Sequence, residues 1–181
     1  GHSAVVQALL DAKADVDVVD DKQKTPLYYA AQHRDCSALC ALIEARAAVN
    51  PSSSSDPSPL HHASRRADAD AMQLLVGANA AVDAVDSDGK TPLHYAMQRG
   101  AAPAVQVLVD ARASVNARSA RGRTALHDAV EQGHRAAAEI LLVAKAFVNV
   151  ADDAHVTPLQ VAASRGYTEI ITLLLHFQQF E

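Results

Sequence analysis

A period of 33 residues runs through the whole sequence and limits what the chain can fold into. Five triplets recur at this step without an insertion: Thr25-Pro26-Leu27, Ser58-Pro59-Leu60, Thr91-Pro92-Leu93, Thr124-Ala125-Leu126 and Thr157-Pro158-Leu159. A second series keeps the same step: Val16-Asp17, Val49-Asn50, Val82-Asp83, Val115-Asn116 and Val148-Asn149. A fixed period of roughly 20 to 50 residues is typical of arrays in which small units stack and bury a shared core.

Each triplet predicts the start of a short helix. Thr91 is a suitable N-cap, and a proline at the first helical position, such as Pro92, lacks an N–H that would have no partner there. Glycine favours the left-handed end of a helix, so Gly100, Gly133 and Gly166 are expected to end these first helices. A second helix is predicted to include residues such as 136–142 and 169–175. The polar stretch at residues 86–89 predicts a turn that joins one unit to the next.

This arrangement resembles the ankyrin repeat, which carries a Thr-Pro-Leu-His signature between a hairpin loop and two antiparallel helices. The resemblance spans the chain. It implies an all-α solenoid of helix-turn-helix units joined by β-hairpin-like loops, all in one structural domain. We expect units at residues 20–52, 53–85, 86–118, 119–151 and 152–181, called below the first to fifth units. Residues 1–19 align with the second helix of a truncated unit, so we expect a fragment of a longer array, unless Gly1-His2-Ser3 is a tag remnant.

The sequence departs from the family pattern at three kinds of position. The glycine that usually follows the second helix is replaced at Lys13, Arg46, Asn79, Arg112 and Lys145, so we expect left-handed non-glycine caps at about 1 kcal/mol each. The basic members stabilise a helix C-terminus or form a basic ladder along one edge. Arg34 and Ala67 replace the glycine between the two helices. Residues 51–57, rich in Ser and Pro, predict an irregular, mobile loop whose Ser52 to Ser55 are candidates for phosphorylation.

Composition excludes several classes of protein. The net charge is -5 with a pI near 6.0, and only seven aromatic side chains serve 181 residues, which argues against nucleic-acid binding. No apolar run is long enough for a membrane span, so no membrane insertion is expected. The two cysteines, Cys36 and Cys40, are too few for a disulfide scaffold and are expected as partly exposed thiols. We therefore expect an intracellular protein of the cytoplasm or nucleus.

No motif predicts catalysis, so we expect neither an enzyme nor a cofactor or metal. His61, His94 and His127 lie one period apart, too far for a shared zinc ion, since stacked helices are about 8–10 Å apart. The resemblance implies instead that each makes a structural hydrogen bond to the neighbouring loop. Asp88-Gly89-Lys90-Thr91 resembles the end of a phosphate-binding loop but lacks the earlier glycine, because Ala84 stands there.

The remaining candidate site is the concave face of the solenoid, where each unit contributes loop-tip and first-helix residues. The loop-tip residues are Lys22, Lys24, Ser87, Asp88, Lys90, Arg121 and Arg123. The helix residues are Gln32, His33, Arg65, Arg66, Gln98, Arg99, Glu131, Gln132 and Arg165. Counted with Asp21 and Asp153, this face holds nine basic and four acidic side chains, an excess of +5. Adding Asp20, Asp56, Asp86 and Asp152 lowers the excess to +1, so an ordinary solvated surface is the alternative.

We therefore predict a protein–protein interaction module whose unidentified partner presents an acidic or extended segment. Arg65, Arg66, Arg99 and Arg121 are the leading contact residues, because arginine is enriched at interaction hot spots and can grip a carboxylate with two hydrogen bonds. The alternative is a regulatory or targeting domain of a larger enzyme. No small-molecule substrate is expected. We expect a monomer, although uncovered Val5, Val6, Leu9 and Leu10 would allow association end to end.

Overall fold

The computed structural model describes residues 3–33, 36–50 and 57–179, and within these ranges the chain forms eleven helices and no strand. The even-numbered helices are α2 (Pro26–His33), α4 (Pro59–Arg66), α6 (Pro92–Ala96), α8 (Ala125–Glu131) and α10 (Pro158–Arg165). The odd-numbered helices are α1 (Ser3–Asp11), α3 (Cys36–Glu44), α5 (Ala69–Gly77), α7 (Ala102–Asp110), α9 (Arg135–Val143) and α11 (Thr168–Gln178).

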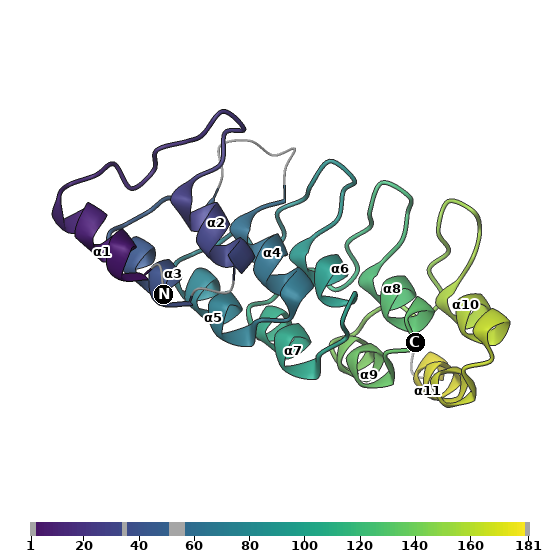
Figure 1. Cartoon of the computed structure of the whole chain (residues 1–181). Helices are drawn as coiled ribbons and strands as arrows, with labels where there is room; N and C mark the ends of the chain where they lie inside the picture. The colour runs from purple at the N-terminus through teal and green to yellow at the C-terminus, as the bar shows by residue number, and fades with distance from the viewer. Residues whose placement is uncertain (1–2, 34–35, 51–56, 180–181) are drawn as a thin grey trace.

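The helices form two rows, and the connecting loops extend from the even-numbered row (Figure 1). Within one unit an even-numbered helix packs on the odd-numbered helix that follows it, as α8 does on α9. Between units each row continues, because α4 packs on both α2 and α6, and α9 packs on both α7 and α11. The fold is the all-α repeat solenoid that the sequence predicts.

The core is built from leucine and alanine at the predicted period. Leu27, Leu60, Leu93 and Leu126 of the recurring triplets are each at most 1% exposed. In the second to fifth units an alanine stands three residues after the triplet leucine, at 63, 96, 129 and 162, and each of these four is fully buried. A side chain no larger than a methyl group lets neighbouring helices approach closely. Large aromatic residues at this position would hold the helices apart, which agrees with the scarcity of such residues in the sequence.

The helix ends follow the predicted chemistry. Ser58 and Thr157 accept hydrogen bonds from the N–H groups of His61 and Gln160 through their hydroxyl oxygens, at 3.4 and 3.3 Å. All five residues that replace the usual glycine after the second helix have a left-handed backbone, with φ between 60° and 65°: Lys13, Arg46, Asn79, Arg112 and Lys145. Ala67 also adopts a positive φ, of 55°. One expectation was wrong: α6 ends at Ala96, four residues before Gly100, and Gly100 is the last residue of the turn at residues 97–100.

Polar side chains of the Val-Asp and Val-Asn series link successive units. An Oδ1 atom of Asp17, Asn50, Asp83 and Asn116 accepts a hydrogen bond from a backbone N–H 31 residues later, in each case at 2.8 Å. Asn50 and Asn116 also donate from Nδ2 to the carbonyl oxygens of Asn79 and Lys145, each at 3.1 Å. This series therefore ties the base of one loop to the base of the next.

Several predictions concern residues at the edges of the described chain. Arg34, residues 51–56 of the Ser/Pro loop with its phosphorylation candidates, and residues 1–2 lie outside the described residues. Helix α1 has no buried residue, and its Val5 and Leu9 are 59% and 54% exposed, in line with the uncovered apolar surface expected there. Cys36 and Cys40 are both partly exposed thiols, as expected.

Candidate functional site

Three buried histidines position the loops of the concave face. His61, His94 and His127 each bring Nε2 to a backbone carbonyl oxygen in the next loop, those of Lys90, Arg123 and Val156, at 3.0, 3.0 and 3.1 Å. The expectation that these histidines bond to the neighbouring loop is confirmed. No group of three or more His, Cys, Asp or Glu side chains in the described part of the chain is arranged to hold a metal ion.

The bonding pattern fixes the protonation state of these histidines. A carbonyl oxygen only accepts, so Nε2 carries the proton and Nδ1 is the acceptor. Nδ1 of His94 indeed lies 3.1 Å from the backbone nitrogen of Thr91, which donates to it. Burial favours the uncharged ring, so desolvation lowers the pKa of His61, His94 and His127. Each ring is therefore uncharged and links a helix start to the following loop by two hydrogen bonds.

A carboxylate shapes the loop tip in three units. Oδ1 of Asp20, Asp86 and Asp152 accepts two backbone N–H bonds across the tip, for example those of Asp88 and Lys90 on Asp86 at 2.9 Å each. In the first and third units a tyrosine completes this arrangement, since Tyr29 and Tyr95 donate from their hydroxyls to Asp20 and Asp86 at 2.6 Å. The fourth unit differs, because Ser119 stands at the aspartate position and Asp128 at the tyrosine position.

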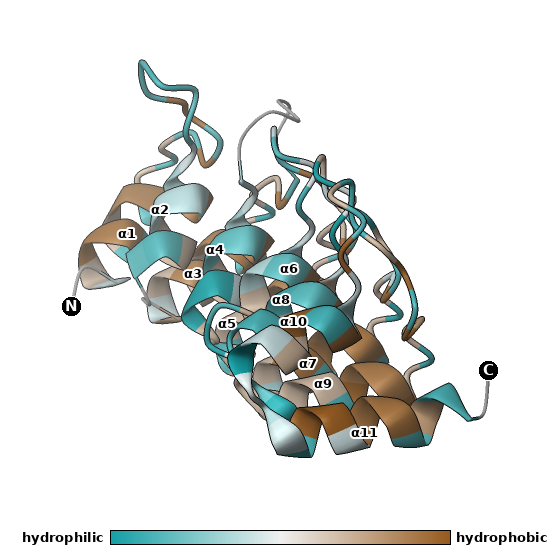
Figure 2. Ribbon diagram, turned by 90° about the vertical axis from the view of Figure 1, so that its right-hand side faces the viewer, coloured by the Kyte–Doolittle hydropathy of each residue, from teal (hydrophilic) through white to brown (hydrophobic). Residues whose placement is uncertain are grey.

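The residues predicted for the concave face are all at least partly exposed. Ten are exposed: Lys22, His33, Arg65, Ser87, Asp88, Gln98, Arg99, Arg121, Gln132 and Arg165. Six are half-buried: Lys24, Gln32, Arg66, Lys90, Arg123 and Glu131. Figure 2 shows the matching polarity, with hydrophilic colour on α4, α6, α8 and α10 and hydrophobic colour on much of α9 and α11. The binding of a partner by these side chains stays a prediction.

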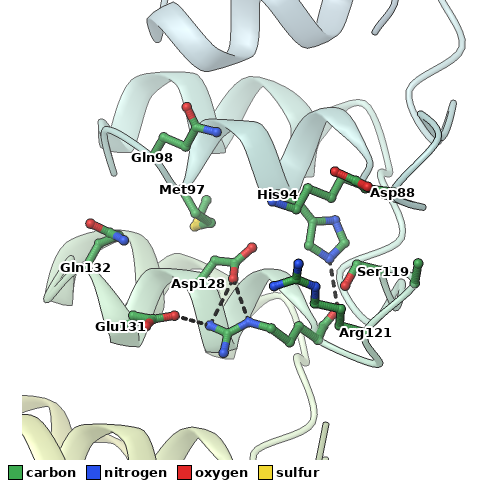
Figure 3. A pocket seen from close by; sticks show the side chains of 12 residues that line it. Asp88, His94, Met97, Gln98, Ser119, Arg121, Asp128, Glu131 and Gln132 are labelled. Atoms are coloured by element: carbon green, nitrogen blue, oxygen red, sulfur yellow. Dashed lines mark hydrogen bonds and ion pairs between the residues drawn. The ribbon is translucent and has the colours of Figure 1, made fainter. Parts of the chain in front are cut away.

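A cleft of about 470 Å³ between the third and fourth units brings part of the predicted set together (Figure 3). Seven predicted residues line it: Asp88, Lys90, Gln98, Arg121, Arg123, Glu131 and Gln132. Five further lining residues were not predicted as contacts: His94, Met97, Ser119, Ala120 and Asp128. The sequence did contain an indication of this cleft. Tyr29 and Tyr95 occupy equivalent positions in the first and third units, and Asp128 replaces the tyrosine in the fourth unit.

Arg123 is held by carboxylates in one wall of this cleft. Its Nε donates to Oδ1 of Asp128 at 3.0 Å, its Nη2 pairs with Glu131, and its Nη1 lies 3.8 Å from Asp152. Glu131 in turn accepts from Nη2 of Arg165 at 3.1 Å. Arg123 and Arg165 are therefore both paired with carboxylates of the same chain, which balance their charges.

Comparison with family models matches ankyrin repeats over the whole chain. A model of three ankyrin repeat copies matches residues 36–119, 60–152 and 115–180, and a model of many copies matches residues 1–43. The chain belongs to the ankyrin repeat family. Ankyrin repeats are generally protein–protein interaction modules and are typically non-catalytic. A comparison with curated proteins found no match. None of the helices in the described part of this ankyrin array is long and apolar enough to cross a membrane.

The ankyrin array engages two of the four leading arginines internally. Arg66 donates from Nη1 to the carbonyl oxygen of Gln32 at 2.8 Å, which joins α4 to α2. Arg65 donates from Nη2 to Nδ1 of His62 at 3.2 Å. The pKa of this buried His62 falls to about 4, mainly because burial disfavours its charged form and then because Arg65 is close.

Lys90, Arg99 and Arg121 stand in a different electrostatic setting. Lys90 and Arg121 line the cleft, and Arg99 follows the lining residue Gln98 in the chain. None of the three cations forms an ion pair within the described residues. The remaining predicted residues, including Lys22, His33 and Ser87, lie outside the cleft lining. Lys22 and Arg65 likewise form no ion pair within the described residues, but among these cations only Lys90 and Arg121 line the cleft in the middle of the array.

Proposed function

We propose that this ankyrin array binds a protein partner across its concave face, centred on the third and fourth units. The observation that carries the proposal is the set of three cations there, Lys90, Arg99 and Arg121, without a carboxylate partner in the described chain. Two neighbouring arginines, Arg123 and Arg165, are by contrast balanced by Asp128 and Glu131. Unbalanced exposed cations favour an acidic partner segment, because opposite charges across an interface raise its association rate and specificity.

Preorganised loops support the same proposal. The loops of the third and fourth units are joined by a hydrogen bond from the N–H of Ala120 to the carbonyl oxygen of Asp88, at 2.8 Å. The next pair is joined from the N–H of Asp153 to the carbonyl oxygen of Arg121, at 3.1 Å. Cross-linked loops lose little conformational entropy when a partner docks, so more of the contact energy remains as affinity. A rigid groove of this kind suits an extended segment better than a ligand that needs an enclosing site.

Charge reversal tests the site. A concave variant would combine Lys90→Glu, Arg99→Glu and Arg121→Glu. A matched control would combine Lys13→Glu, Arg46→Glu and Arg112→Glu, which change the net charge equally at exposed helix ends outside the cleft. Wild type and both variants are used to capture proteins from a lysate of the source cells, and the captured proteins are compared by mass spectrometry. Thermal unfolding of both variants is recorded, so that loss of capture can be separated from loss of the fold.

We expect a protein that is retained by wild type and by the control but lost by the folded concave variant. Equal retention by all three proteins would contradict the assignment of the site and move the interface away from the third and fourth units. Loss with both variants would show that net charge, and not this face, governs retention, which also contradicts the assignment.

A further inference from the structure

Aromatic rings meet edge to face at the first two junctions between full units. Tyr28 of α2 faces His62 of α4, with ring centroids 4.6 Å apart and an angle of 76° between the planes. One period later, His61 faces Tyr95 with centroids 5.2 Å apart and an angle of 80°. The partner always stands 34 residues after the first ring. Such edge-to-face packing is a favourable geometry for aromatic pairs and fills the space between successive even-numbered helices and their loops.

The third junction lacks the second ring. The residue 34 positions after His94 is Asp128, whose carboxylate pairs with Arg123. At the fourth junction the residue 34 positions after His127 is Val161, a buried aliphatic side chain that is 8% exposed. Among these four junctions, only the third has a charged side chain at this position. The cleft of about 470 Å³ lies at this junction and is lined by both His94 and Asp128.

A ring bound in the cleft would lie close to a thioether and an imidazole. Met97 and His94 both line the cleft, and since they are only 0% and 2% exposed they lie beneath its surface. Figure 3 shows the guanidinium of Arg121 extending toward the space between His94 and Asp128. Guanidinium groups and thioethers are both favourable neighbours of an aromatic ring, through cation–π and sulfur–aromatic contacts respectively.

We propose that this cleft receives an aromatic side chain from the partner, of the tyrosine or phenylalanine type, within a segment that also carries a carboxylate. The ring takes the place that Tyr95 fills opposite His61, and the carboxylate meets Lys90 and Arg121. These two cations have no ion-pair partner in the described chain, whereas Arg123 in the same cleft is already balanced. This inference rests on the proposed function, because it specifies the chemistry of the protein segment bound at the same face.

The test follows the two methionines by NMR, with their methyl groups labelled with carbon-13. Met97 lines the cleft, and Met72 lies fully buried in α5 and serves as an internal control. The probes are the peptide acetyl-Glu-Tyr-Glu-amide, its alanine analogue acetyl-Glu-Ala-Glu-amide, and N-acetyltyrosinamide, which presents the ring without carboxylates. A ring bound in the cleft shifts the nearby Met97 methyl signal through its ring current and leaves that of Met72 in place.

We expect saturable shifts of Met97 with the tyrosine peptide, and binding of the alanine analogue weaker by about tenfold or more. N-acetyltyrosinamide should shift the same signal with lower affinity than the tyrosine peptide. An unmoved Met97 signal at saturating tyrosine peptide would overturn the inference. So would equal affinity of the tyrosine and alanine peptides, because the cleft would then recognise charge alone.

Two substitutions locate the probe. Asp128→Tyr restores the missing ring and should abolish the Met97 shift while the chain stays folded, as judged by an unchanged Met72 signal. Arg121→Glu changes an exposed loop residue and should weaken the tyrosine peptide about tenfold, which provides a second test should the filled cleft disturb folding. Retained binding in both variants would place the peptide elsewhere and overturn the inference.

The two proposals fail separately. If the peptides do not bind while charge reversal still abolishes capture of a partner, the concave face remains the binding site and only the aromatic specificity is wrong. If the peptides shift Met97 while charge reversal leaves capture intact, the cleft binds a ring but is not the main interface of the array.

Discussion

Nε2 of His94 and the carbonyl oxygen of Arg123 lie 3.0 Å apart, and this bond joins the start of α6 to the loop of the next unit. Because the other ring nitrogen accepts the N–H of Thr91, a second proton on His94 would place two N–H groups against each other. The same relationship recurs at His61 and His127. The position of three loops therefore depends on neutral histidines.

Acid should destabilise the array through these rings. Burial lowers the pKa of His61, His94 and His127 in the folded state, whereas the unfolded chain takes up protons near the ordinary value of about 6.5. The unfolded state then binds more protons than the folded state, so the free energy of unfolding falls as the pH drops below about 6.5. Urea unfolding at several pH values between 7.5 and 5 should show this decrease.

Replacing one histidine isolates its share. His94→Gln should reduce the slope of the unfolding free energy against pH by at most about 1.4 kcal/mol per pH unit, the equivalent of one proton. Glutamine suits the position, because Gln160 accepts the N–H of Thr157 at 2.8 Å in the fifth unit. Gln98→Ala, at an exposed position of the same unit, is the control and should leave the slope close to that of wild type, because neither side chain titrates. An undiminished slope in His94→Gln would contradict the role of this ring.

Asn116 should contribute to stability through both ends of its amide. Its Oδ1 accepts the N–H of Phe147 at 2.8 Å and its Nδ2 donates to the carbonyl oxygen of Lys145 at 3.1 Å. Asn116→Ala loses both bonds and should lower the free energy of unfolding by about 2 kcal/mol. Asn116→Asp keeps the acceptor, as Asp83 does at the same position one period earlier, and should cost about 1 kcal/mol. Urea unfolding at neutral pH would give this order, and equal losses would show that only one end of the amide matters.

The sequence was enough to predict the solenoid, because each level of structure repeats at the same period. The threonine caps, the buried leucines such as Leu93 and the left-handed caps such as Lys145 each depend on local chemistry that one unit shows and the others repeat. His61, His94 and His127 stand at the same place in three of the five helix starts, and the resemblance to the ankyrin repeat implied their bonds to the next loop. Agreement of this kind requires no knowledge of long-range contacts, since each unit touches only its neighbours.

The charge pattern of the concave face was less predictable. The charge count from the sequence included Arg123 and Arg165 as unpaired cations. In the fold both pair with Glu131 of α8, Arg123 from the preceding loop and Arg165 from α10. Arg66 is likewise used in packing, through the carbonyl oxygen of Gln32. Pairings that cross from one unit to the next depend on rotamers and loop positions, which a linear pattern of charges does not contain. The cleft itself arises from a departure at Asp128, so it could be found by asking which unit breaks the repeat.

The left-handed caps can be used to measure strain. Arg112 has φ of 60° and its side chain is exposed, so Arg112→Gly removes strain without removing a buried contact. The free energy of unfolding should rise by about 0.5–1 kcal/mol, because a non-glycine residue in this region is disfavoured. Chemical denaturation is sufficient to measure the change. A decrease would mean that the favourable charge of arginine at the C-terminus of α7 outweighs the relief of strain.

Two glycines with nearly the same backbone separate strain from crowding. Gly89 and Gly166 have φ of 67° and 70°, so alanine is strained to a similar degree at both positions. A Cβ at residue 89 would lie 2.8 Å from the backbone nitrogen of Ala120, whereas a Cβ at residue 166 would meet no atom within 4 Å. Gly166→Ala should therefore cost about 1 kcal/mol from strain alone. Gly89→Ala should cost more, because it also pushes apart the loops that the bond from Ala120 to Asp88 holds together. Hydrogen exchange at the Ala120 amide should accelerate in Gly89→Ala and not in Gly166→Ala, and similar exchange in both would show that the two loops are not coupled at this point.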